Sequence, residues 1–171
     1  MHELEKHIRD IPDFPKPGIV FKDITPLLKS PEGFKKTIEI LEKQIRPQNP
    51  DLLLGIESRG FLFGGALALK MGLGLIIARK PGKLPYDTDS VSYDLEYGSA
   101  TLELHKDAVS PGQRVLIIDD LLATGGTAAA CARLVRNQQG QVAGHAFVVE
   151  LAFLEGRKKL EPDPVSSILV Y

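Results

Sequence analysis

The sequence predicts an α/β protein with a mostly parallel central sheet flanked by helices. Short, continuous apolar runs alternate along the chain with helical patterns, which is typical of a parallel sheet covered on both faces. The runs expected to form buried strands are residues 51–57, 73–79, 114–119, 142–151 and 166–171. At 171 residues, the chain is expected to form a single domain spanning residues 1–171.

Three helices are expected, one before these strands and two between them. In the amphipathic segment 30–47, Ser30 is the expected N-cap and Pro31 occupies the first helical position. Its apolar stripe consists of Phe34, Ile38, Leu41 and Ile45. The other two helices are expected over residues 61–71 and 127–139, each ending at a glycine, Gly72 and Gly140.

Two segments depart from the parallel pattern. Residues 99–105 alternate between apolar and polar side chains, which predicts a half-exposed, antiparallel strand. Residues 10–30 are rich in proline and aspartate and are expected to form an extended flap across the sheet. His105 and His145 lie in strand patterns, and we interpret both as structural.

Composition narrows the function. With 43% hydrophobic residues, 25% charged residues and a net charge of −1, the chain lacks the basic excess of a general nucleic-acid binder. The charged N-terminus does not resemble a signal peptide, and no apolar run reaches the roughly 18 residues of a membrane span. The single cysteine, Cys131, is expected in a helix core and excludes an intrachain disulfide. We therefore expect a cytoplasmic protein.

The stretch VLIIDDLLATGGT, residues 115–127, carries the clearest chemical signal. A glycine-rich turn before a helix points backbone N–H groups and the positive end of the helix dipole outward, which favours phosphate. Asp119 and Asp120, at the preceding strand end, repel phosphate but accept hydrogen bonds from hydroxyl groups or hold a divalent cation. Phosphate, hydroxyls and metal together describe a phosphorylated sugar.

Two further strand ends carry cationic groups. Glu57-Ser58-Arg59-Gly60 again leads from a strand into a helix, and Arg79-Lys80-Pro81-Gly82-Lys83 places three cations within five residues. A sugar with a phosphate at one end and a diphosphate at the other would use all three strand ends. Neither the GxxxxGK[ST] nor the GxGxxG pattern is present, so nucleoside triphosphate and NAD sites lack sequence support.

Residues 115–127 resemble the phosphoribosyl-diphosphate motif of the type I phosphoribosyltransferases. Further segments, in this order, are similar to the adenine phosphoribosyltransferase family in particular: residues 12–28, 57–64, 79–85, 93–98 and 102–113. The resemblance implies that fold, with an N-terminal base-binding flap (1–30) and a mobile catalytic lid (80–98). It also implies Mg²⁺-dependent conversion of adenine and phosphoribosyl diphosphate to AMP and pyrophosphate, a purine-salvage reaction, by a cytoplasmic homodimer.

The resemblance also assigns residues to the phosphorylated substrate. Ala123, Thr124, Gly125, Gly126 and Thr127 would hold the 5-phosphate, and Asp119 and Asp120 the ribose hydroxyls and the metal-bound substrate. Pyrophosphate would be bound by Glu57, Ser58, Arg59, Gly60, Arg79, Lys83 and Tyr97. The family often has a cis peptide at the position of Glu57–Ser58. Lys83 would act within one subunit or across the dimer.

The base site rests on the same resemblance. Glu96 would share a proton with adenine N7, which makes Glu96, Arg59 and Lys83 the expected catalytic residues. Adenine would lie against Phe21, with Val20 and Lys22 beside it. Many members have arginine where this chain has Lys22, so the side-chain role at this position stays open.

Two alternatives differ from this function. One is a phosphoribosyltransferase for another base, namely hypoxanthine, guanine, xanthine or orotate, although the Val20-Phe21 segment and Glu96 favour adenine. The other is a regulator that keeps the phosphoribosyl-diphosphate site without catalysis. Such regulators usually carry an added DNA-binding segment, for which 171 residues are expected to leave no room.

Overall fold

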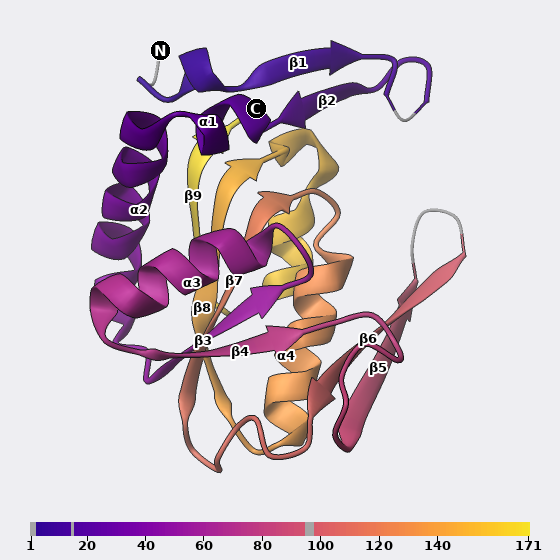
Figure 1. Cartoon of the computed structure of the whole chain (residues 1–171). Coiled ribbons are helices and arrows are strands. Elements are labelled where there is room, and N and C mark those ends of the chain that lie inside the picture. Colours follow the sequence, from indigo (N-terminus) through magenta and orange to yellow (C-terminus); the bar gives the residue numbers. More distant parts are fainter. Residues whose placement is uncertain (1–2, 15, 95–97) are drawn as a thin grey trace.

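The computed structural model describes residues 3–14, 16–94 and 98–171. At its centre lies a five-stranded sheet in the order β4-β3-β7-β8-β9 (Figure 1). Every pairing within this sheet is parallel, as the continuous apolar runs predict. The strands are β3 (Leu52–Ile56), β4 (Gly74–Ala78), β7 (Arg114–Leu122), β8 (Gln141–Glu150) and β9 (Val165–Val170).

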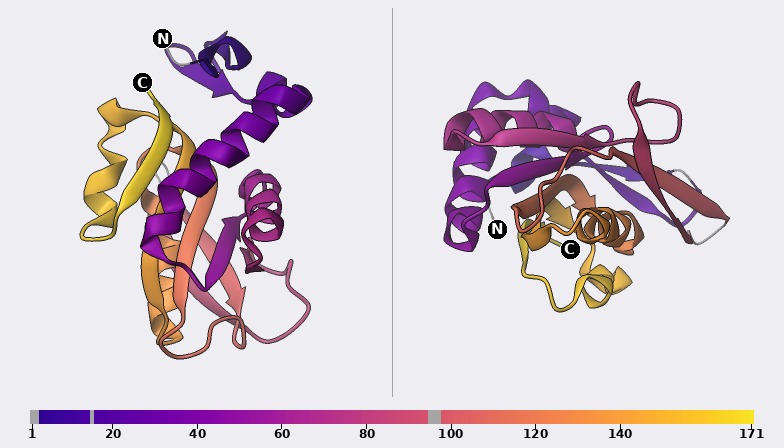
Figure 2. Two further views of the ribbon diagram at one scale, coloured as in Figure 1. Left: turned by 90° about the vertical axis from the view of Figure 1, so that its left-hand side faces the viewer. Right: turned by 90° about the horizontal axis from the view of Figure 1, so that it is seen from below.

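Helices cover both faces of the sheet (Figure 2). The helices α2 (Pro31–Ile45) and α3 (Gly60–Met71) pack on one face, and α4 (Gly126–Asn137) packs on the other. Alternate residues of β7 serve the two cores: Ile117 packs with the α4 side, whereas Ile118 packs with α2 and α3. The predicted α/β architecture is confirmed.

Helix α2 forms for the reasons its sequence suggests. Ser30 Oγ accepts a hydrogen bond from Gly33 N at 3.0 Å, and Pro31 opens the helix. Ile38, Leu41 and Ile45 are buried. The helix ends at Ile45, and a 3₁₀ turn over Arg46–Gln48 completes the predicted segment.

A β-hairpin packs on the outer side of α4. It consists of β5 (Thr88–Asp94) and β6 (Ser99–His105), which pair antiparallel, so the prediction for residues 99–105 is confirmed. Val91, Leu102 and Leu104 are buried in the same core as the α4 side chains. Residues 88–94 of the segment expected to form a lid, residues 80–98, therefore belong to a strand docked on a helix.

The N-terminal segment lies across the end of the sheet, next to the C-terminus (Figure 1). After a 3₁₀ turn (Glu5–His7), β1 (Arg9–Pro12) and β2 (Val20–Asp23) form an antiparallel hairpin, and α1 (Thr25–Lys29) follows. The prediction of an extended flap over residues 10–30 is wrong for its last part, which is helical. We refer to residues 9–29 as the hood.

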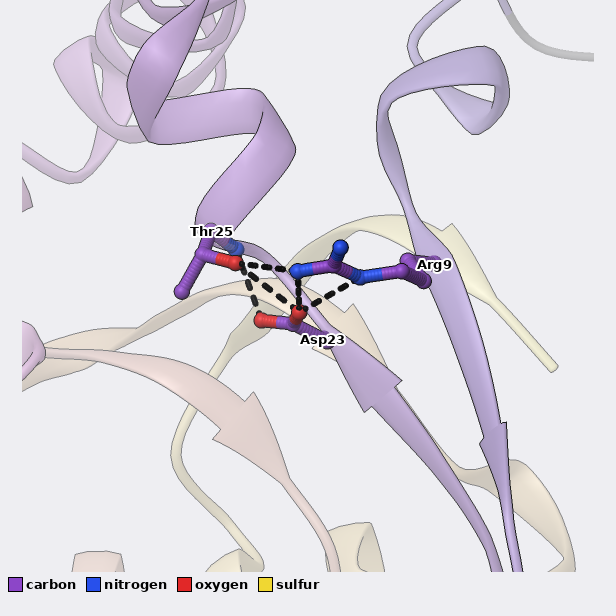
Figure 3. Close-up of polar contacts among 3 residues, drawn as sticks. All are labelled: Arg9, Asp23 and Thr25. Carbon is purple, nitrogen blue, oxygen red and sulfur yellow. Dashed lines mark hydrogen bonds and ion pairs between the residues drawn. The ribbon is translucent and has the colours of Figure 1, made fainter.

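Within the hood, side chains from β1, β2 and α1 bond to one another at the point where β2 leads into α1 (Figure 3). Arg9 Nη2 donates to Asp23 Oδ2 at 2.7 Å, and the Thr25 hydroxyl donates to the same oxygen at 2.8 Å. The Thr25 amide donates to Asp23 Oδ1 at 2.9 Å. The hydrogen bond that the Thr25 amide donates lowers the pKa of Asp23, and the bond from Arg9 adds to this effect.

The buried positions of His145 and Cys131 agree with the structural roles that the sequence predicts for them. His145 is fully buried, with Nε2 3.4 Å from Asp163 Oδ2, and burial lowers its pKa. Cys131 is buried in α4 as a free thiol. None of the helices in the described part of the chain has both the length and the apolar character that a membrane span requires.

We predict that Asp23→Ala lowers the free energy of unfolding by about 1 kcal/mol, because the hydrogen bonds from Thr25 at the start of α1 and the ion pair with Arg9 are lost together. Urea denaturation measures the change. The matched control is Asp10→Ala, which also removes an ion pair of the hood. Asp10 Oδ1 lies 2.7 Å from Lys22 Nζ, and the Asp10 side chain is 56% exposed. Equal losses in the two variants would contradict the assigned role of Asp23.

The same comparison has a defined pH dependence. Because the folded-state pKa of Asp23 lies below its ordinary value, its stabilisation is fully present above about pH 3.9 and disappears as the pH falls through the folded-state pKa. The difference between wild type and Asp23→Ala should therefore shrink at acid pH. A constant difference would contradict ionisation as its source.

Candidate active site

Three loops meet at the edge of the sheet formed by the carboxyl ends of β3, β4 and β7. The parallel register places these ends side by side, and ligands of open α/β sheets bind at this edge. The loops are residues 57–59, 79–83 and 123–125. Strand β7 is longer than predicted, since it runs through both aspartates to Leu122. Asp119 and Asp120 therefore project from a strand and not from a flexible turn.

Asp119 and Asp120 follow one another in β7, and their carboxylates are close enough for the charge of one to affect the other. Asp120 is only 5% exposed, on the face that carries α3. Asp119 is half-buried, and its Oδ1 accepts the Asp120 amide at 2.9 Å. Burial, together with the neighbouring Asp120 charge, raises the pKa of Asp119 well above its ordinary value. Holding both carboxylates ionised in this place is therefore unfavourable, and a hydrogen-bond donor or a cation beside Asp119 would stabilise the pair.

Arg59 is the partner of Asp120 in this structure. Its Nε lies 2.5 Å from Asp120 Oδ2, although the arginine side chain is 46% exposed. The guanidinium carbon also lies 6.0 Å from the centroid of the Phe21 ring in the hood. One cation therefore connects β7, the loop after β3 and the hood.

The loop after β7 is held by contacts between backbones. Gly125 has φ +78°, and a Cβ there would overlap the carbonyl oxygen of Gly156. A Cβ at Gly156 would in turn overlap the carbonyl oxygen of Ala123. Gly156 opens the 3₁₀ turn η4 (Gly156–Leu160). Sequence reasoning missed Gly156, because a single glycine outside any motif gives no signal of this contact.

This loop borders a cavity of about 70 Å³. The cavity is lined by the predicted phosphate loop, Ala123 to Thr127, by its flanking residues, and by Asp119 and Phe147. The phosphate loop and a carboxylate of the pair therefore share one hollow, as the sequence stretch suggested. The helix that starts here, α4, has no side-chain cap on its first amide groups.

The loop after β3 begins with a cis peptide between Glu57 and Ser58, which the family resemblance implied. The Glu57 carboxylate accepts Arg79 Nη2 at 3.1 Å and Lys80 N at 2.9 Å, and these bonds lower its pKa. Arg79 Nη1 also donates to the Lys83 carbonyl oxygen at 3.1 Å. The Glu57 side chain thus joins two of the predicted pyrophosphate loops. A carboxylate used this way orients the cations of the two loops.

Gly60 permits the close approach of α3 to β7. A Cβ at this position would lie 2.6 Å from the Ile118 carbonyl oxygen and 3.1 Å from Asp119 Oδ1. The first turn of α3 can therefore rest directly against the strand that carries the two aspartates. Ser58 is exposed at the start of this turn, and Lys83 is exposed in the neighbouring loop.

The hood residues predicted to bind adenine differ in accessibility. Val20 is 47% exposed. The half-buried Phe21 ring is in edge contact with Phe14, with 5.4 Å between centroids. Lys22 is committed elsewhere, because its Nζ lies 2.7 Å from Asp10 Oδ1 and 4.0 Å from the centroid of the Tyr171 ring. Its side chain fastens the hood to the C-terminus, which leaves backbone groups for base recognition.

Two predicted residues, Glu96 and Tyr97, lie outside the described residues. Within the described ranges, no group of three or more His, Cys, Asp or Glu side chains is placed to hold a metal ion. Asp119 and Asp120 supply two adjacent carboxylates. Such a donor set fits Mg²⁺ whose other ligands come from substrate phosphates and water.

We predict that Gly125→Ala weakens the binding of ribose 5-phosphate at least tenfold, measured by calorimetric titration. A side chain there is strained at positive φ and displaces the loop from Gly156. Gly112→Ala, before the start of β7, is the matched control, since Gly112 also has a positive φ and a Cβ there meets nothing within 4 Å. Unchanged binding in Gly125→Ala would show that this loop does not hold the phosphate.

Comparison with known proteins agrees with this geometry. The family model described as phosphoribosyl transferase domain matches residues 23–168. Adenine phosphoribosyltransferase of Desulfitobacterium hafniense is 54% identical over 99% of this chain and 98% of its own length. That of Trichlorobacter lovleyi is 52% identical over the full length of both chains.

Solved structures extend the likeness to the fold. Adenine phosphoribosyltransferase from Thermoanaerobacter pseudethanolicus superposes with a TM-score of 0.96 at 53% identity, covering 99% of this chain and 98% of that one. The Saccharomyces cerevisiae enzyme, crystallised with an imino-altritol bisphosphate and adenine, gives a TM-score of 0.91 at 42% identity, covering 97% and 96%. With the carboxylate pair, the glycine loop and the cationic loops gathered at one sheet edge, the chain belongs to the adenine phosphoribosyltransferase family of phosphoribosyltransferases.

Proposed function

We propose that the chain transfers the 5-phosphoribosyl group from phosphoribosyl diphosphate to adenine, giving AMP and pyrophosphate. The observation that carries this proposal is the junction of three subsites at one sheet edge. The Asp119–Asp120 pair lies on β7, the phosphate loop 123–127 follows that strand, and Arg59 connects the pair to the hood. Each subsite suits a different part of the two substrates.

The 5-phosphate would be held by the amides of the loop after β7, from Ala123 to Gly126, and by the hydroxyls of Thr124 and Thr127. The uncapped start of α4 supports this placement, because the first helical amides are available to an anion. The ribose hydroxyls would donate to Asp119 and Asp120. A donor at Asp119 relieves the cost of holding two carboxylates together in a partly buried place.

The leaving pyrophosphate would meet cations from two loops. Arg59 and Arg79 would stabilise the negative charge of pyrophosphate as the anomeric bond breaks. Further contacts would come from Lys83, Tyr97 and the polar groups of Ser58 and Gly60. Arg59 is held by Asp120 in this structure, so substrate binding would exchange one anionic partner for another. Glu57 keeps Arg79 in place for this role.

Mg²⁺ would enter with phosphoribosyl diphosphate and, when bound, neutralise the developing charge of the diphosphate. Asp119 and Asp120 would orient the metal-bound substrate through its hydroxyls and waters.

Adenine recognition falls to the hood. The base would lie against Phe21, with the backbone of Val20 and Lys22 reading its edge, and Glu96 would share a proton with N7. Support comes from the relatives, which are named for adenine, and from the yeast structure, which contains adenine. The lysine at position 22 is compatible with this arrangement, because its side chain faces Asp10 and Tyr171.

We also propose a cytoplasmic homodimer in which the parts of the expected lid, residues 80–98, that lie outside β5 cover the bound substrates and exclude water. Leu62 and Leu69, seven residues apart on one side of α3, are 49% and 87% exposed, which supports an apolar contact surface. Lys83 would reach the site of its own subunit or of the partner.

The proposal predicts that purified protein with Mg²⁺ and phosphoribosyl diphosphate converts adenine to AMP at least a hundredfold faster than it converts hypoxanthine, guanine, xanthine or orotate, since a base site of fitted hydrogen bonds rejects mismatched bases strongly. Product formation is measured for each base separately. Comparable rates with hypoxanthine would overturn the base assignment. Binding of phosphoribosyl diphosphate without turnover of any base would instead support the regulator.

A second prediction concerns the proton on the base. Glu96→Ala should lower kcat by about a hundredfold or more, as expected for loss of an acid–base group, while the Kd of phosphoribosyl diphosphate changes less than threefold. Glu96→Gln is the control that keeps the size of the side chain, and it should lose comparable activity. Collapse of phosphoribosyl-diphosphate binding in both variants would remove Glu96 from the acid–base role.

A further inference from the structure

Tyr93 on β5 reaches the phosphate loop from a different element. Its hydroxyl lies 3.2 Å from Thr127 Oγ1 at the start of α4. Its ring covers the preceding residue, since a Cβ at Gly126 would lie 3.3 Å from the ring carbon Cδ2. Tyr93 therefore contacts two consecutive residues of the loop proposed to hold the 5-phosphate.

The hairpin that carries Tyr93 is fixed to α4 at two further points. Arg133 Nη2 donates to the Ser92 carbonyl oxygen at 2.9 Å. Gln138, just beyond the end of α4, donates to Asp89 Oδ2 at 3.0 Å and to the His105 carbonyl oxygen at 2.8 Å. These bonds, in the second half of α4 and just beyond its end, hold β5 against the helix, so the position of the Tyr93 hydroxyl is defined by the fold.

The direction of this hydrogen bond matters for an anion. Each hydroxyl has one proton, and phosphate oxygens only accept hydrogen bonds. If Thr127 donated to Tyr93, its proton would be unavailable to phosphate. If Tyr93 donates to Thr127, the Thr127 proton is free for the anion, and the chain Tyr93 to Thr127 to phosphate strengthens both bonds.

We propose that Tyr93 is a positioning residue that donates to Thr127 Oγ1 and thereby orients the Thr127 hydroxyl toward the 5-phosphate of the sugar substrate. Tyr93 touches no substrate atom and acts through Thr127. The inference rests on the proposed function, because it takes residues 123–127 as the 5-phosphate subsite.

The variant Tyr93→Phe keeps the ring over Gly126 and removes only the hydroxyl. Its KM for phosphoribosyl diphosphate and its Ki for ribose 5-phosphate should rise about three- to tenfold, the change that loss of one hydrogen bond produces. Its kcat and its KM for adenine should stay within about twofold of wild type. Inhibition by pyrophosphate, which has no sugar phosphate, should not change.

Ser92→Ala is the matched control. Its hydroxyl lies 2.9 Å from Thr101 Oγ1 across the same hairpin and points to the other face of β5. Loss of that bond tests whether loosening the hairpin alone affects binding, and we expect less than a twofold change in Ki. A rise in the control equal to that in Tyr93→Phe would overturn the proposal in favour of general hairpin stability.

A double-mutant cycle with Thr127→Val tests whether Tyr93 acts through Thr127. Once the threonine hydroxyl is gone, Tyr93→Phe should have no further effect on ribose 5-phosphate binding. Additive losses would contradict the proposal, as would unchanged binding in the single Tyr93→Phe variant.

Calorimetric titration with ribose 5-phosphate carries the same comparison without turnover. If wild type binds ribose 5-phosphate but fails to convert adenine, the proposed function fails while the effect of Tyr93→Phe on Kd still decides this inference. If wild type converts adenine and Tyr93→Phe binds ribose 5-phosphate as tightly as wild type does, the inference alone fails.

Discussion

The site depends on two adjacent carboxylates that one strand holds in a partly buried place. Asp119 and Asp120 follow one another in β7, so their charges are close together. Asp120 is compensated by Arg59, whereas burial and the neighbouring charge raise the pKa of Asp119. This arrangement is costly in an empty protein and suits a ligand that brings hydroxyl groups and a metal-bound diphosphate.

Close backbone contacts bring the other groups to this pair. Gly60 lets the start of α3 rest on β7 beside Asp119, and Gly125 and Gly156 let the loop after β7 rest on η4. Around this rigid edge, Arg59 lies near Phe21 of the hood, and Tyr93 of the hairpin bonds to Thr127. The hood and the hairpin, far apart in sequence, are thus both connected to the strand and loop that would hold the sugar phosphate.

The sequence predicted the parts of this site that local chemistry determines. Continuous apolar runs predicted the parallel strands, and the Ser30-Pro31 start with its apolar stripe predicted α2. The helical end of the flap was missed, because the helix Thr25–Lys29 has only five residues and its first amide bonds to Asp23, which belongs to a strand. The extension of β7 past Asp119 was missed because charged residues normally end a buried run, whereas here Arg59, sixty-one residues away along the chain, compensates Asp120.

Contacts between distant segments could not be predicted in the same way. Nothing in the sequence around Gly156, Tyr93 or Gln138 indicates that they meet the phosphate loop or the hairpin, since each contact depends on tertiary packing. Lys22 combines both cases. The family resemblance placed it in the N-terminal flap, but only the folded chain shows that its side chain contacts Asp10 and Tyr171. Roles that depend on one motif are visible in sequence, and roles that depend on packing are not.

We expect the carboxylate pair to exchange Arg59 for the sugar while the phosphate loop holds the other end of the same ligand. A crystal structure of the protein with Mg²⁺ and phosphoribosyl diphosphate tests this most directly. The account predicts the 5-phosphate on the amides of residues 123–127, the ribose hydroxyls within hydrogen-bonding distance of Asp119 and Asp120, and Arg59 turned from Asp120 to the diphosphate. A complex in which Arg59 stays bonded to Asp120 while the ribose hydroxyls contact neither aspartate would contradict it.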